Sequence, residues 1–171
     1  MTPHSVLHVA PILVPPPAPP VVVRAAGRDD APALHRLSRV FARTGELRER
    51  TVAEYARDAA DFLLAESAPG RIEGCAGLRI HAAPEGRDPG RTAVVYNFCV
   101  AAASQGRGVG TALLTTLLAE AAARSAATVF AATSGDAALF LRHGFTVADV
   151  SAAWPAGLAP RPGSRVLSRA L

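Results

Sequence analysis

One glycine-rich stretch, residues 105–110, has the composition of an anion-binding loop. It reads Gln-Gly-Arg-Gly-Val-Gly and joins an apolar segment to a leucine-rich one. Glycines let the backbone approach a ligand closely, and the start of a helix offers unpaired N–H groups with a partial positive charge. Gln105 and Arg107 add side-chain donors beside the loop. The stretch therefore predicts a site for phosphate.

Two familiar phosphate-binding motifs do not fit this loop. A dinucleotide fingerprint requires Gly-x-Gly-x-x-Gly, and Gly106, Gly108 and Gly110 do not have that spacing. A nucleotide P-loop closes on Gly-Lys-Ser or Gly-Lys-Thr, and the chain contains no lysine. An ordinary turn before a helix remains as an alternative, although glycine is unfavourable so near a helix start unless its backbone geometry is needed.

Few other residues have the chemistry of a reactive or metal-binding site. Cys75 and Cys99 lie in apolar stretches, which favours buried free thiols over a disulfide, a metal site or a nucleophile. His4 and His8 are four residues apart, but the prolines near them disfavour the helix that a metal pair would need. We therefore expect no metal site.

The charged residues do not have the pattern of a nucleic-acid-binding protein. All 18 basic residues are arginines, 14 residues are acidic, and the net charge is +4. The arginines are scattered, with no interleaved aromatic residues for base stacking. Positive charge still favours an anionic cofactor. The sequence has neither a long apolar run nor a basic leader, so we expect no nucleic-acid or membrane partner and a cytoplasmic location.

The hydrophobic pattern predicts one α/β (α+β) domain over residues 21–171, preceded by a proline-rich disordered tail at 1–20. Strands are predicted at 21–24, 61–66, 71–81, 92–100, 128–133, 145–150 and 165–171, and helices at 33–41, 111–124, 136–143 and from Thr51. Pro69-Gly70 indicates an early hairpin, and the strand, helix and strand from 92 to 133 form a β-α-β unit. A mixed sheet flanked by helices follows.

Residues 105–110 resemble the Gln/Arg-x-x-Gly-x-Gly/Ala pyrophosphate loop of the GNAT acetyltransferase superfamily. In that family the loop follows strand four, as it follows Asn97–Val100 here. Residues 138–145, Ala-Leu-Phe-Leu-Arg-His-Gly-Phe, are similar to the family's helix that ends in Gly-Phe. The similarity covers about residues 21 to 150. It implies a mostly antiparallel central sheet with a late β-α-β unit that binds acetyl-CoA.

The resemblance also implies how the cosubstrate acetyl-CoA is held. Pantetheine pairs with the backbone around Val100 like an added strand. One backbone N–H, which we take to be that of Val100, polarises the acetyl carbonyl. The cofactor-binding residues implied in this way are Phe98, Cys99, Val100, Gln105, Gly106, Arg107, Gly108, Val109, Gly110, Thr111, Ser134 and Phe140. Many members have tyrosine where this chain has Phe140, so another group or water protonates the leaving thiolate, or it leaves unprotonated.

Residues 45–51, 61–79 and 164–171 are similar to the acetyltransferase domain of the N-acetylglutamate synthase family and to other amino-acid N-acetyltransferases. By that resemblance Arg50, Arg79 and Ser164 hold the carboxylates of the acceptor. Each arginine taken alone is more typical of a solvated surface charge.

Two residues of the strand at 71–81 are candidate proton acceptors. Glu73 shares the predicted polar face with Arg79, and either acts as the base or water-orienting residue or forms a plain salt bridge. His81 is the second candidate.

Together these features and the resemblance imply an N-acetyltransferase that transfers an acetyl group directly to an amine, with the α-amine of glutamate or a similar amino acid as one acceptor. Another small-molecule or protein amine, or a non-catalytic acyl-CoA-binding module, are the alternatives. The expected partner is a small-molecule amine, and a homodimer is left open.

Overall fold

The computed structural model describes residues 20–82, 90–148 and 160–171. Its strands are β1 (Val22–Ala25), β2 (Phe62–Ala68), β3 (Arg71–His81), β4 (Arg91–Val100), β5 (Ala126–Thr133), β6 (Thr146–Val147) and β7 (Arg165–Ala170). Its helices are α1 (Ala31–Arg43), α2 (Val52–Arg57), α3 (Val109–Ala123) and α4 (Ala138–Arg142), with short 3-10 turns η1 (Arg28–Asp30), η2 (Ala59–Asp61) and η3 (Ala102–Ser104). Residues 1–19 of the predicted tail and residues 149–150 of a predicted strand lie outside these ranges, as do residues 83–89 and 151–159.

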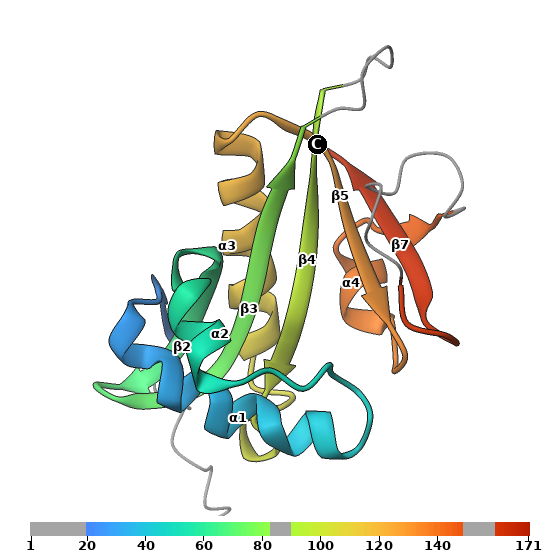
Figure 1. The fold of residues 1–171 in the computed structure, drawn as a ribbon. Coiled ribbons are helices and arrows are strands. Elements are labelled where there is room, and N and C mark those ends of the chain that lie inside the picture. The colour runs from blue at the N-terminus through green and yellow to red at the C-terminus, as the bar shows by residue number, and fades with distance from the viewer. Residues whose placement is uncertain (1–19, 83–89, 149–159) are drawn as a thin grey trace, which may run out of the picture.

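Within the described residues, seven strands form one sheet in the order β1-β2-β3-β4-β5-β7-β6. Only β4 and β5 are parallel, and α3 connects them as the crossover of a β-α-β unit. The other neighbouring strands are antiparallel. The predicted mixed, mostly antiparallel sheet flanked by helices is therefore confirmed (Figure 1).

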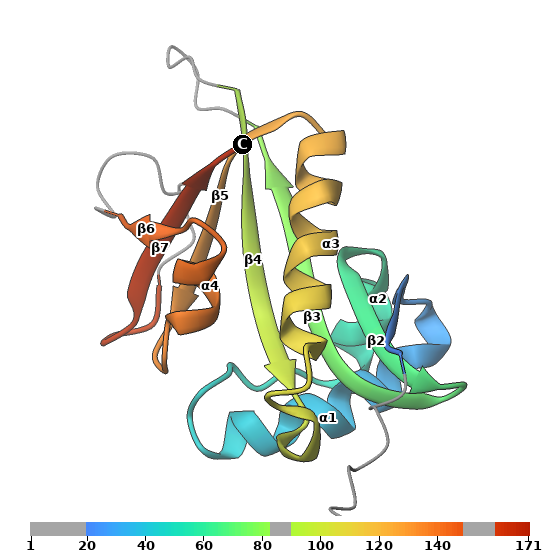
Figure 2. The same cartoon turned by 180° about the vertical axis from the view of Figure 1, so that it is seen from behind.

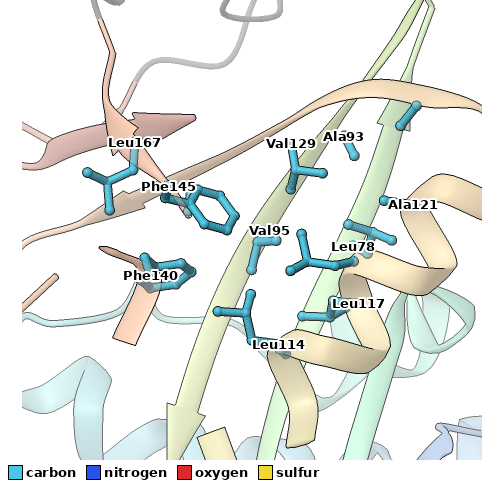
Figure 3. Close-up of a cluster of buried hydrophobic side chains, with 14 of the residues drawn as sticks. Leu78, Ala93, Val95, Leu114, Leu117, Ala121, Val129, Phe140, Phe145 and Leu167 are labelled. Atoms are coloured by element: carbon cyan, nitrogen blue, oxygen red, sulfur yellow. The ribbon is translucent and has the colours of Figure 1, made fainter. Parts of the chain in front are cut away.

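Helices cover both faces of the sheet. On one face α3 runs along β3 and β4, and α4 lies beside β5 and β7 (Figure 2). The leucines of α3, including Leu114 and Leu117, are buried there against Leu78, Val95 and Val129 (Figure 3). On the other face, α1 and α2 pack against the first strands through a second buried cluster that includes Leu34, Tyr55, Phe62, Leu64, Cys75 and Cys99.

Several local signals in the sequence give the elements they predict. Thr51 is the N-cap of α2 and forms a capping box with Glu54. The chain turns at Gly70, with φ of 76°, between the strands of the β2–β3 hairpin. Gly144, with φ of 79°, ends the α4 segment, and the Phe145 N–H donates back to the Phe140 carbonyl.

Two local features differ from what residue type and pattern alone suggest. Asp30 is the N-cap residue of α1, but its carboxylate accepts from the Gly27 N–H and from Arg24 rather than from the first turn of the helix. The alternating pattern of β3 predicted one polar face, but every residue from Glu73 to Leu78 is buried. Helices on both faces of the sheet explain this, because neither face of the strand is left to solvent.

A bulge in β4 changes which residues face which helix. Cys75 pairs with Cys99 and Gly77 with Tyr96, so β4 has one more residue than β3 over this interval. Asn97 lies in the bulge with φ of 50°. Before the bulge Val95 faces α3, and after it Phe98 and Val100 contact the first turns of α3, while Cys99 faces α1.

The bulge is tied to the helical layer by Tyr55, which is fully buried. Its hydroxyl donates to Asn97 Oδ1 at 3.2 Å and also contacts the Ser38 hydroxyl. Tyr55→Phe should lower the free energy of unfolding by about 1–2 kcal/mol, because both polar partners lose a buried hydrogen bond. Chemical denaturation of both proteins measures this difference, and an unchanged midpoint would show that the hydroxyl does not stabilise the bulge.

Candidate active site

The sheet opens where β4 and β5 separate. Their pairing ends at Val95 and Ala131, although β4 continues to Val100 and β5 to Thr133. On the other edge of β4, the Ala101 N–H donates to the Glu73 carbonyl at 2.7 Å. Because successive N–H groups along a strand point to opposite edges, the Val100 N–H points away from β3, into the opening. An extended ligand could pair with this edge as an added strand.

The glycine-rich loop borders the same end of β4. Gly106 and Gly108 have φ of 72° and 84°, in the left-handed region that favours glycine, and a Cβ at either position would meet no atom of a non-neighbouring residue within 4 Å. Gly108 is the N-cap of α3. Gln105, Arg107 and both glycines are exposed. The loop therefore presents open backbone at a helix N-terminus, which suits a phosphate.

The other predicted cofactor residues have different surroundings. Gly110 has a packing role, since a Cβ there would lie 3.0 Å from Leu139 Cδ2 of α4. Val109 is buried, whereas Thr111 is exposed in the first turn of α3. The ring of Phe140 is buried between Phe98 and Phe145, with centroids 5.5 and 5.3 Å away (Figure 3 labels Phe140 and Phe145). It adds an apolar wall without a proton donor.

A pocket of about 340 Å³ lies beside this opening. Its walls come from residues 46–48 and Arg50 after α1, from Arg79 and His81 of β3, from residues 94–97 of β4, and from Ala132, Ser134, Pro160, Arg161 and Ser164. The structure therefore brings together the three predicted acceptor residues, Arg50, Arg79 and Ser164, with Ser134. The lining contains four arginines and one glutamate, so the pocket favours an anionic ligand.

Arg50 is held rigidly at the pocket wall. It forms an ion pair with Asp58, and its guanidinium lies 5.3 to 5.8 Å from the ring centroids of Tyr55, Phe62 and Tyr96. Hydrogen bonds from Arg57 and then Arg50 lower the pKa of Asp58 to about 2, so this carboxylate stays ionised. The Arg50 side chain is 17% exposed, so it is oriented by contacts rather than solvated.

Arg79 has a different environment from Arg50. Its guanidinium donates to Asp61 Oδ2 at 2.6 and 3.0 Å and lies 5.1 Å from the ring centroid of Tyr96. The Tyr96 hydroxyl donates to the same carboxylate oxygen. Each arginine therefore has a carboxylate partner, Asp58 for Arg50 and Asp61 for Arg79. Arg50 is the better candidate for direct binding of a ligand carboxylate, because its buried Nε has no hydrogen-bond partner.

Buried polar atoms without a hydrogen-bond partner gather at this pocket. Among the described residues there are three: Arg50 Nε, His81 Nε2 and Arg161 Nη1, and all three residues line it. Such atoms are unfavourable unless a ligand or water satisfies them. Burial first and then Arg79 lower the pKa of His81, so its ring is neutral near pH 7. Arg161, Tyr96 and Asn97 were not among the predicted site residues.

Glu73 lies outside the pocket. Its carboxylate is buried and accepts from the hydroxyls of Ser104 and Ser67, which lower its pKa. Arg79, six residues along the strand, belongs to the separate cluster with Asp61. The salt-bridge alternative for Glu73 is observed, with Arg71 Nε at 2.9 Å from Oε1, and the position of Glu73 argues against its role as the base.

The two thiols have no catalytic surroundings. Cys75 and Cys99 are free and buried, with their Sγ atoms 3.5 Å apart. The hydrogen bond between Cys75 and Cys99, and then burial, raise the pKa of the Cys99 thiol, which disfavours a nucleophilic thiolate. In the described ranges, no group of three or more His, Cys, Asp or Glu residues could hold a metal ion. None of the helices described has the length and hydrophobicity of a membrane span.

Comparison with known proteins gives one family. Residues 58–147, more than half of the chain, match the family model for the acetyltransferase (GNAT) domain. No curated protein matches the sequence.

Three similar solved structures contain CoA or acetyl-CoA. N-acetylglutamate synthase from Neisseria gonorrhoeae, solved with coenzyme A and N-acetyl-glutamate, has a TM-score of 0.73 and 22% identity over 88% of this chain and 35% of that one. Rv2747 from Mycobacterium tuberculosis, solved with CoA and NLQ, has a TM-score of 0.71 and 25% identity, covering 88% and 99%. The Salmonella typhimurium protein yncA, with acetyl-CoA, has 0.68 and 21%, covering 89% and 94%. The chain thus spans about a third of the Neisseria protein.

The phosphate loop can be tested with an isosteric pair of substitutions at Gly108. Asn and Asp both tolerate the left-handed backbone at this position, so Gly108→Asn and Gly108→Asp should destabilise the fold similarly. Only Gly108→Asp places a negative charge at the loop, and we expect it to bind acetyl-CoA at least about tenfold more weakly than Gly108→Asn. Calorimetric titration measures both affinities, and equal affinities would refute the loop assignment.

Proposed function

The chain belongs to the GNAT acetyltransferase domain family, and from that premise we propose that it transfers the acetyl group of acetyl-CoA directly to the α-amine of glutamate or a similar amino acid. The observation that carries the acceptor proposal is the arginine-rich pocket beside the opening between β4 and β5. Three buried polar atoms without a partner line it, and the carboxylates of an amino acid supply the acceptors that Arg50 and Arg161 lack.

The cofactor site that we propose consists of the opening between β4 and β5 and the glycine-rich loop at residues 105–110. The pyrophosphate would lie on the open backbone of residues 105–110, and pantetheine would pair with the free edge of β4 near Val100. The Val100 N–H, which points into the opening, would donate to the acetyl oxygen and stabilise its negative charge in the tetrahedral intermediate. Related structures from Neisseria gonorrhoeae and Mycobacterium tuberculosis contain CoA, which supports this placement.

The acceptor must reach the acetyl group as a neutral amine. Arg50 and Arg161, with the hydroxyl of Ser164, would hold its carboxylates and place the amine beside the end of β4. His81, which lines the pocket with a neutral ring and a buried Nε2 that has no partner, is the proton acceptor that we propose in place of Glu73. The Neisseria enzyme was solved with N-acetyl-glutamate, which agrees with an acceptor of this class.

A non-catalytic acyl-CoA-binding module is the second candidate, and Phe140 is the observation that favours it. The ring stands where many family members have the tyrosine that protonates the thiolate, and it is packed between two other phenylalanine rings. A CoA thiolate can nevertheless leave unprotonated, because thiol pKa values lie close to neutrality. An enzyme releases CoA when an acceptor is added, whereas a binding module only gains thermal stability.

Phe140→Tyr tests whether the missing acid matters. We expect the variant to fold, to keep its affinity for acetyl-CoA within about twofold, and to turn over at least as fast as the wild type, because a phenol can protonate the departing thiolate. Steady-state kinetics and calorimetry measure the two quantities. A large loss of acetyl-CoA affinity would mean that the apolar packing of this ring, rather than the absence of a hydroxyl, is what the site requires.

Arg50→Ala tests the carboxylate-binding role. Loss of a charged hydrogen bond should lower kcat/KM for glutamate by about ten- to a hundredfold, mainly through KM, while acetyl-CoA affinity stays unchanged. Arg57→Ala is the matched control, because Arg57 shares the Asp58 carboxylate with Arg50 but does not line the pocket.

The assay compares glutamate, its side-chain amide and an amine without a carboxylate as acceptors. The control variant should behave like the wild type on all three. If the wild type prefers the amine without a carboxylate, or if Arg50→Ala and Arg57→Ala lose the same activity on glutamate, the acceptor proposal fails and the acetyltransferase assignment remains.

A further inference from the structure

Glu73 is a buried charge that the proposed reaction does not use. Its side chain is 8% exposed, yet both carboxylate oxygens have partners. Ser67 of β2 donates to Oε1, which also pairs with Arg71 Nε at 2.9 Å, and Ser104 of η3 donates to Oε2. A buried carboxylate is tolerated only when hydrogen bonds or an ion pair compensate its charge. Loss of any one of these contacts therefore destabilises the fold around Glu73.

Residues 73 and 74 of β3 contact the segment that carries the phosphate loop at three points. The Glu73 carbonyl accepts from the Ala101 N–H, where the chain leaves β4. The Glu73 carboxylate accepts from Ser104, the residue directly before Gln105. Gly74 lies so close to α3 that a Cβ there would be 3.0 Å from Val109 Cγ1. Residues 73 and 74 of β3 therefore contact the segment 101–109 at its start, in its middle and at its end.

We propose that Glu73 is a positioning residue, which acts through Ser104 to hold the phosphate loop in the shape that binds the pyrophosphate of acetyl-CoA. This inference rests on the cofactor part of the proposed function. Ser104 is 1% exposed, so neither its hydroxyl nor the carboxylate beneath it faces a ligand. The loop that follows contains two glycines in left-handed conformations and would otherwise populate many shapes. Fixing it before binding reduces the ordering cost of binding.

Two serine variants separate loop positioning from general stability. Ser104→Ala and Ser67→Ala each remove one hydroxyl from the same carboxylate, but only Ser104 belongs to the segment that leads into the loop. We expect Ser104→Ala to weaken CoA binding about five- to tenfold and Ser67→Ala to change it by less than about twofold. Calorimetric titration with CoA gives the affinities, and thermal unfolding shows that both variants are folded.

Glu73→Gln distinguishes a positioning role of Glu73 from a catalytic one. It also provides a test of the proposal if Ser104→Ala does not fold. The amide keeps the shape of the carboxylate and can still hydrogen-bond to both hydroxyls. For a positioning residue we expect kcat at saturating acetyl-CoA within about threefold of the wild type, with an unchanged dependence of kcat on pH, whereas loss of a general base lowers kcat by roughly a hundredfold or more.

The results decide the proposal in either direction. Weaker CoA binding in Ser104→Ala alone, with the kcat profile of Glu73→Gln unchanged, supports it. Equal effects of the two serine variants, no effect of Ser104→Ala, or loss of kcat and of its pH dependence in Glu73→Gln overturns it. Wild-type protein that does not bind CoA at all would instead refute the proposed function, so the two failures are distinguishable.

Discussion

The separation of β4 from β5 after Val95 and Ala131 is the constraint on which the proposed site depends. These strands are parallel neighbours, joined through α3, and a sheet that remained closed would pair every backbone group of β4 with protein. Because they diverge, one edge of β4 near Val100 is left for an extended ligand. The same divergence leaves room for the arginine-lined pocket, so cofactor and acceptor can meet at the end of one strand.

The two arginines Arg79 of β3 and Arg50, which precedes α2, have different partners. Arg79 is neutralised by Asp61 and supports Tyr96, whereas Arg50 is oriented by Asp58 and three aromatic rings and retains an unsatisfied Nε. A cation fixed before the ligand arrives loses little side-chain entropy on binding. The acidic residues around the pocket therefore act as supports for cations rather than as competitors for them.

Features encoded by consecutive residues could be predicted from the sequence, and features that depend on distant contacts could not. The left-handed glycines of the 105–110 loop, the β2–β3 hairpin and the cap at Thr51 follow from local glycine and capping chemistry. The bulge at Asn97 leaves no such signal, since only the register against β3 reveals the extra residue. Glu73 and Arg79 share a strand pattern, but their partners come from η3 and η2, far apart in the chain. Alternation along the strand could not separate these two environments.

The most direct test of the account follows free CoA when acetyl-CoA and purified protein are mixed with glutamate, with glutamine, or with an amine that has no carboxylate, and identifies the acetylated product by mass. We expect CoA release matched one for one by an N-acetyl amino acid, and little release with the amine that has no carboxylate. Protein whose melting temperature rises with acetyl-CoA but which releases CoA with none of these acceptors would contradict it.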